Sequence, residues 1–262
     1  MCNKNSYSFL TVIIVITVKN VNGFSYNSIG KEGIDTISLI WEYFGSHMDD
    51  YLTVLREHVA ISLMALAISV ILGISAGYVC VRSPRLEKWL TGTFQTLRIV
   101  PSLAILILLI PFLGTGVKPA LVALVLLAIP PILLNTVTGL TEVPDFMLET
   151  ASGLGMTEKQ VMYRVKFPMA FPLIMTGVKT AMIEIVASAA LAAKIGAGGL
   201  GGLIFTGLGL NRLDLLLVGG ISVALLSLVS GAILDGIEKM MTPYLQTAPK
   251  RRIRGRRKAG RL

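Results

Sequence analysis

Long uncharged runs of apolar residues alternate with short polar loops over most of this chain. A helix of about 20 apolar residues rises roughly 30 Å, which is the thickness of the hydrocarbon core of a bilayer. The pattern therefore predicts an all-α membrane protein with about five transmembrane helices. The expected spans are residues 61–81, 99–117, 119–141, 171–193 and 215–234, and Pro101 and Pro111 can interrupt helical bonding in the second.

The region before the first expected span has a weaker pattern. A short apolar run at residues 9–18 follows Lys4, and its length suits a signal-peptide core better than a span. A cleaved signal and an uncleaved anchor both remain open. The following residues mix aromatic and charged side chains, which is typical of an amphipathic segment at the membrane surface. We expect a signal-like or anchor segment over 1–36, an interfacial segment over 37–58, a transmembrane domain over 59–240 and a basic cytoplasmic tail over 241–262.

Composition and charge support a membrane protein and indicate its orientation. Only 15% of the residues are charged, against roughly 25% in soluble domains. Lys and Arg gather in the loops at 82–88 and 142–168 and in the tail, so we expect these three on the cytoplasmic side of a bacterial cell membrane. The net charge of +9 is thus explained by topology and lipid contact, with no nucleic-acid partner. The two cysteines lie far apart, and we expect no metal site or cofactor.

The polar loop between the third and fourth spans has a pattern of its own. Pro144 and Asp145 suit the start of a helix. Gly155 allows the chain to turn, and Thr157 with Gln160 has the spacing of a capping box. We expect two short helices around a glycine turn, and such a hairpin can dock in a groove on a soluble partner.

This loop resembles the E-A-A loop of ABC importer permeases, whose pattern is E-A-A, three residues, G, nine residues and I-x-L-P. Thr150, Val165 and Phe167 depart mildly from it. In that family the loop is the coupling helix that fits into the ATPase subunit, whereas the alternative is an ordinary cytoplasmic loop. We also expect the proline to limit helix continuation and to start the next element. The matching positions, to which the resemblance gives the coupling role, are Glu149, Ala151, Gly155 and Pro168.

A second unusual stretch, IGAGGLGGLIFTGLG at residues 195–209, is too rich in glycine for a plain helix. Its backbone can approach a neighbour closely or flex as a gate, and a flexible external turn is the alternative. No Lys-Ser/Thr pair follows the glycines, so the stretch is not a nucleotide-binding loop. We expect ATP hydrolysis on a separate chain and no catalytic residues here. The residues expected at the gate are Gly196, Gly198, Gly199, Gly201 and Gly202.

Further stretches resemble the osmoprotectant permeases, the importers of glycine betaine, carnitine and choline. They are Gln95-Thr96 with residues 101–104, residues 130–136, 155–157 and 191–201. The departures are the extra residues 98–100 and Lys194. The resemblance implies a permease subunit that translocates a small quaternary-ammonium solute. It also implies three kinds of partner: a second permease copy or a paralogue, cytoplasmic ABC ATPases, and an extracellular or periplasmic binding protein.

Two charges inside the fourth span need an explanation, because charges within a bilayer are costly. Lys179 and Glu184 either line a translocation path, or Lys179 extends to the membrane interface while Glu184 pairs with a neighbour or across a dimer. A secondary transporter that uses both for ion coupling is an alternative, as is a permease for methionine or another small solute. The lone histidines His47 and His58 are expected at the interface.

Overall fold

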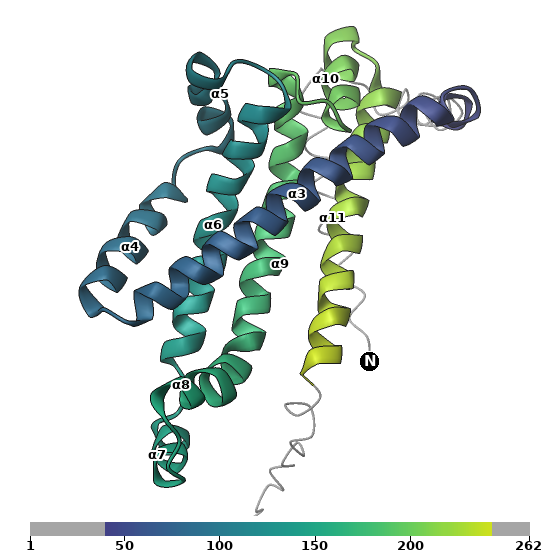
Figure 1. Cartoon of the computed structure of the whole chain (residues 1–262). Helices are drawn as coiled ribbons and strands as arrows, with labels where there is room; N and C mark the ends of the chain where they lie inside the picture. Colours follow the sequence, from purple (N-terminus) through teal and green to yellow (C-terminus); the bar gives the residue numbers. More distant parts are fainter. Residues whose placement is uncertain (1–39, 243–262) are drawn as a thin grey trace, which may run out of the picture.

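The computed structural model describes residues 40–242, and these residues are helical with no strand among them (Figure 1). The all-α prediction is therefore confirmed. Residues 1–39 and 243–262, which contain the expected anchor segment and most of the basic tail, lie outside the described part. The elements are α3 (Met48–Val81), α4 (Pro84–Leu97), α5 (Ser102–Leu113), α6 (Val117–Thr141), α7 (Asp145–Gly153), α8 (Glu158–Val161), the π-helical turn η1 (Met162–Lys166), α9 (Phe167–Ala192), the 3-10 turn η2 (Ala193–Ile195), α10 (Gly201–Leu210) and α11 (Leu213–Met241).

Within residues 40–242, four helical runs are long and apolar enough to cross a membrane. A bent pair, α4 with α5, adds a fifth candidate if it is counted as one broken span; its two helices meet at 96°. This number agrees with the expected five. The four unbroken runs are Met48–Val81, Val117–Thr141, Glu158–Ile195 and Leu213–Met241.

The first span is longer than predicted. Residues 61–81 form the C-terminal part of α3, a helix of 34 residues that begins at Met48. The chain between Met48 and residue 61 contains no glycine or proline that would end a helix. The surface position expected for residues 37–58 stays a prediction, although its second half is continuous with the span.

The bounds predicted for the second span, residues 99–117, are wrong, because the broken candidate span runs over Arg85–Leu97 and Ser102–Leu113. The interruption expected at Pro101 is present. The chain bends before Pro101, which precedes α5 at its N-cap. Gly114 and Gly116 then have positive φ angles of 76° and 108° and separate α5 from α6. The 12 residues of α5 cover about 18 Å at 1.5 Å per residue, too little to cross a bilayer alone.

The helix α6 lies at the centre of the bundle, where it packs between α3 and α9 (Figure 1). Leu124, Ile132 and Leu133 on α6 are fully buried. Two glycines of α3 allow the close approach. A Cβ added at Gly73 would lie 2.8 Å from the Ile132 side chain, and one at Gly77 would lie 2.7 Å from the Thr136 side chain. Small residues at a helix contact are the usual means of tight packing in membranes.

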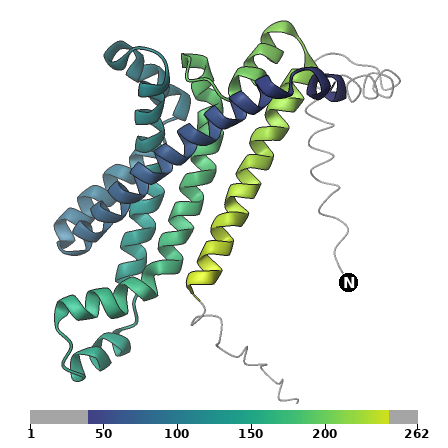
Figure 2. The same cartoon turned by 45° about the vertical axis from the view of Figure 1, so that its right-hand side comes forward.

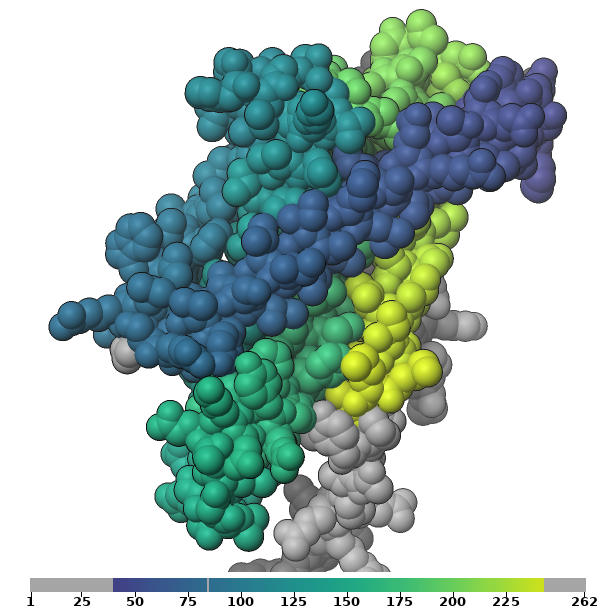
Figure 3. Space-filling model, in the orientation of Figure 1, coloured from purple at the N-terminus to yellow at the C-terminus, as the bar shows by residue number. Residues whose placement is uncertain are grey.

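The bundle has two distinct ends. The α3–α4 loop, the α7–α8 hairpin and the C-terminal end of α11 lie at one end, and α5 and α10 lie at the other (Figure 1). The hairpin projects beyond the packed helices (Figure 3). This arrangement matches the one expected from the Lys and Arg distribution, in which the hairpin end is cytoplasmic.

Candidate functional site

The hairpin at residues 145–161 has the predicted local structure. The helix α7 ends at Gly153, and Gly155 takes a φ of 74°, in the left-handed region that glycine favours. The capping box at the start of α8 is complete. The Gln160 N–H donates to Thr157 Oγ1 at 3.4 Å, and the Thr157 N–H donates to Gln160 Oε1 at 2.9 Å. The prediction of two short helices around a glycine turn is confirmed.

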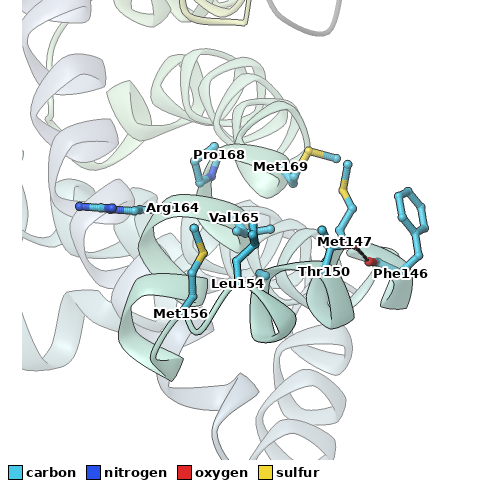
Figure 4. A pocket seen from close by; sticks show the side chains of 10 residues that line it. Phe146, Met147, Thr150, Leu154, Met156, Arg164, Val165, Pro168 and Met169 are labelled. Atoms are coloured by element: carbon cyan, nitrogen blue, oxygen red, sulfur yellow. Dashed lines mark hydrogen bonds between the residues drawn. The ribbon is translucent and has the colours of Figure 1, made fainter.

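The hairpin encloses an apolar groove of about 450 Å³ against the start of α9 (Figure 4). Ala151 and Pro168 both line it, and Ala151 is buried. Two large side chains at the groove are open to the outside, since Phe146 is 64% exposed and Leu154 is 74% exposed. Exposed apolar side chains gathered on a projecting element are typical of a protein contact surface. Glu149 lies on the exposed surface of α7 and does not line the groove.

Pro168 lies in the first turn of α9, so it starts the next element as expected. The expectation that it limits helix continuation is wrong, because the chain stays helical from Glu158 to Ile195. A proline lacks the amide hydrogen of a regular turn, and its ring crowds the carbonyl four residues earlier. Here the preceding turn, η1, is π-helical, and the Phe167 N–H donates to the Met162 carbonyl oxygen. The wider turn accommodates the proline, and the hairpin meets α9 at a bend (Figure 2).

The glycine loop, residues 196–200, joins η2 to α10 at the end opposite the hairpin. Gly196, Gly198 and Gly199 have positive φ angles of 83°, 76° and 78°, which other residues rarely adopt. The Gly116 N–H donates to the Ile195 carbonyl oxygen at 2.7 Å, so the loop is tied to the chain between α5 and α6.

The two remaining glycines differ from each other. A Cβ at Gly201 would lie 1.9 Å from the Ala190 carbonyl oxygen, whereas one at Gly202 would meet nothing within 4 Å. Gly201 is therefore required for the approach of α10 to α9. No such packing constraint acts at Gly202.

Two residues of α3 lie against the glycine loop, Glu57 through a hydrogen bond and His58 through packing beside Gly199, and sequence reasoning predicted neither contact. Glu57 Oε2 accepts a hydrogen bond from the Gly199 N–H at 3.0 Å. His58 is fully buried, with Nε2 3.2 Å from the Val186 carbonyl oxygen on α9. The expectation of an interfacial His58 is therefore wrong. These partners are more than 120 residues apart in the chain, so no local pattern indicates them.

The two charges of the fourth span have different surroundings. Lys179 Nζ lies 2.7 Å from Asp235 Oδ1 and 2.7 Å from Glu238 Oε2, so it joins α9 to α11. Glu184 is half-buried and makes no hydrogen bond or ion pair with any residue between 40 and 242. The structure therefore does not pair Lys179 with Glu184.

Comparison with known proteins identifies the family to which this chain is similar. Residues 69–245 match the family described as the binding-protein-dependent transport system inner membrane component. The chain belongs to this family. It is thus a multi-pass inner-membrane component of a binding-protein-dependent transport system. The matched region contains the hairpin, the glycine loop and both charges of α9, while Glu57 and His58 precede it.

Individual permeases are similar over most of their length. The chain is 41% identical over 187 residues to the carnitine transport permease protein OpuCB of Listeria monocytogenes, with 71% of this chain and 86% of that protein covered. It is 38% identical, with the same coverage, to the choline transport system permease protein OpuBB of Bacillus subtilis (strain 168). A solved structure of the MetNI methionine ABC transporter, inward facing, aligns with a TM-score of 0.67 at 20% identity, covering 73% of this chain and 96% of that one. The similarity to the MetNI chain shows that the two chains share a fold.

Proposed function

We propose that this permease is the membrane-spanning subunit of an ATP-driven importer for a small quaternary-ammonium osmoprotectant, of the class of glycine betaine, carnitine and choline. The observation that carries the proposal is its similarity to carnitine and choline permeases over a region that includes both the hairpin and the glycine loop. An external binding protein delivers the solute. ATP is hydrolysed by a separate cytoplasmic ATPase, and two permease copies, or one copy and a paralogue, enclose the path.

The hairpin is the proposed contact with the ATPase. Ala151 and Pro168 shape its apolar groove, and Gly155 makes the turn that brings α8 back beside α7. Glu149 presents a carboxylate on the exposed surface of α7. Closure of the ATPases on ATP pushes the hairpin and switches access from outside to inside. Such a switch requires that ATP and the loaded binding protein favour different conformations.

The glycine loop is the proposed gate at the opposite end. Its positive-φ glycines let the backbone adopt conformations that other residues rarely take. Glu57 holds the loop in the observed conformation by accepting a hydrogen bond from the Gly199 N–H. Loops that open and close during transport need residues that can absorb such changes in backbone conformation.

The test is purification of the tagged permease in mild detergent, with identification of the chains that accompany it, followed by uptake assays in vesicles. We expect a stoichiometric ATPase that carries a nucleotide-binding loop, and ATP-dependent uptake of carnitine, choline or glycine betaine in the presence of the binding protein. Gly155→Arg, which places a bulky cation in the turn, should release the ATPase. Gly153→Ala, two residues earlier in the same hairpin, is the control that should retain it. A permease that purifies alone and transports under an ion gradient would refute the proposal.

A further inference from the structure

The bend between the hairpin and α9 is the weakest part of the continuous helical run. In the π-helical turn η1 the hydrogen bond reaches one residue further than in an α-helix, and Pro168 in the next turn has no amide hydrogen to donate. Helices kink at features of this kind. The helices α7 and α8 pack against η1 and project beyond the bundle (Figure 3). A push on the hairpin therefore increases the bend unless another element supports it.

Three aromatic rings connect this bend to α3. The Tyr163 ring in η1 stacks on the Phe167 ring at the start of α9, with the two centroids 6.1 Å apart and an angle of 16° between the planes. The Phe167 ring lies 6.3 Å from the Tyr78 ring of α3, centroid to centroid, at an angle of 47°. Rings separated by about 4.5–7 Å attract one another. We call Tyr78, Phe167 and Tyr163 the aromatic bridge.

The α3 end of the aromatic bridge is held in place from two sides. Arg82 Nη2 donates a hydrogen bond to Tyr78 Oη, and the same guanidinium lies over the Tyr78 ring, 4.8 Å from its centroid. The ring face attracts a cation at this position. The neighbouring residue, Gly77, packs so closely on α6 that a Cβ there would lie 2.7 Å from the Thr136 side chain. Tyr78 therefore belongs to a helix that is fixed to the centre of the bundle.

Phe167 is one of the positions at which this chain departs from the loop pattern of ABC importer permeases, which has leucine there. Leucine is also apolar, but it has no ring to stack on Tyr163 or to contact Tyr78. The aromatic bridge thus depends on this chain's own residues and is not implied by the resemblance. The same comparison supplies a mild test, because Phe167→Leu removes the ring and keeps a side chain that suits such a loop.

We infer that the aromatic bridge holds the bend at η1 against α3, so that a displacement of the hairpin is carried into α9 instead of being absorbed by further bending. Its residues, together with Arg82, are positioning residues for transport. The inference rests on the proposed function, in which the ATPase pushes the hairpin, and adds how that push reaches the transmembrane helices. Without the bridge, ATP hydrolysis continues but moves less solute.

The test is the number of ATP molecules hydrolysed per solute molecule imported, which we call the ATP-to-solute ratio. It is measured on the full complex of permease, ATPase and binding protein in vesicles, with whichever of carnitine, choline or glycine betaine the unaltered complex imports. Phe167→Leu and Tyr78→Leu should each raise the ratio about threefold or more, because each removes an aromatic contact. Tyr78→Phe keeps the ring and should stay within about 1.5-fold of the unaltered value. Trp89→Leu, which removes an exposed ring of the neighbouring helix α4, is the control that should leave the ratio unchanged.

The ATP-to-solute ratio separates a positioning role from a structural one, because a smaller amount of folded complex lowers hydrolysis and uptake together. The double variant gives a second criterion. Tyr78→Leu should add nothing in a Phe167→Leu permease, since both changes break the same contact.

An unaltered ratio in the Phe167→Leu complex would overturn the inference, as would two effects that multiply in the double variant. Loss of the ATPase from the Phe167→Leu complex would also overturn it, because Phe167 would then hold the ATPase contact and not the bend. Phe167→Leu decides the question alone if Tyr78→Leu yields no complex. Absence of ATP-driven uptake of any of these solutes by the unaltered complex would instead refute the proposed function, and the inference with it.

Discussion

A pair of neighbouring glycines allows a sharp test of the packing at the glycine loop. Gly201→Ala would put a Cβ 1.9 Å from the Ala190 carbonyl oxygen and 2.7 Å from its carbonyl carbon. Both atoms belong to the backbone of α9, which cannot turn aside as a side chain can. Overpacking of this kind costs about 1–3 kcal/mol. Gly202→Ala meets nothing within 4 Å and lies in α10, where alanine stabilises a helix by about 0.5–1 kcal/mol relative to glycine.

The two variants should therefore differ in the free energy of unfolding by about 1.5–4 kcal/mol. For a chain of this size each kcal/mol moves the unfolding midpoint by about 2–4 °C. Thermal unfolding of the purified permease in one detergent measures the difference, since both variants add the same methyl group to adjacent positions. Equal midpoints would show that α10 does not approach α9 as closely as the structure has it. Uptake by Gly202→Ala separately tests the proposed gate. If the start of α10 must flex during transport, alanine should slow uptake even though it stabilises the permease.

Three further predictions concern the other contacts of the site. Gly155→Ala puts a side chain at a φ of 74°, which destabilises the turn by about 1–2 kcal/mol. It should lower ATP-driven uptake in vesicles, whereas Gly153→Ala should not. Equal uptake by the two variants would contradict a role for the turn. Lys179→Met removes the cation that joins two carboxylates of α11 and should cost on the order of 1–2 kcal/mol, since the pairs are only partly buried. This is more than Asp235→Asn, which keeps the pair with Glu238; denaturation in detergent ranks the two, and the reverse order would be inconsistent with the ion pairs. Glu57→Ala removes the acceptor for the Gly199 N–H and should slow uptake, while Glu57→Gln keeps an acceptor oxygen and should retain part of it, so matching rates for these two variants would count against the hydrogen bond.

The features that sequence reasoning predicted well are local ones. Apolar runs set most of the spans because a bilayer demands about 20 apolar residues. The capping box of Thr157 and Gln160 depends on residues three apart, and both of its hydrogen bonds are present. The two short helices of the hairpin follow from the same local signals. A pattern within one turn of helix needs no knowledge of the rest of the fold.

The features that it missed depend on residues far apart or on the bounds of a broken span. Lys179 pairs with acidic residues 56 and 59 positions later in the chain. No local pattern in α9 or α11 indicates this pairing. The break around α5 did have a signal, because Pro101 precedes it and Gly114 follows it. The interruption at Pro101 was therefore predicted. The bounds of the span were not, because the charged and polar residues of α4 do not resemble part of a membrane span.

One continuous helical run connects the two ends of the proposed machinery. It extends from Glu158 in the hairpin to Ile195 at the edge of the glycine loop, and it carries Glu184 between them. A push on the hairpin is thus applied directly to α9, the helix that carries Glu184. The ion pairs of Lys179 tie the same helix to α11, so α9 and α11 should move together. The π-helical turn before Pro168 is the point where this run bends (Figure 2), and a change in that bend would alter the position of Glu184 without breaking the helix. Coupling between distant sites requires an element with two arrangements that both sites favour differently, and α9 with its bend has contacts at both sites.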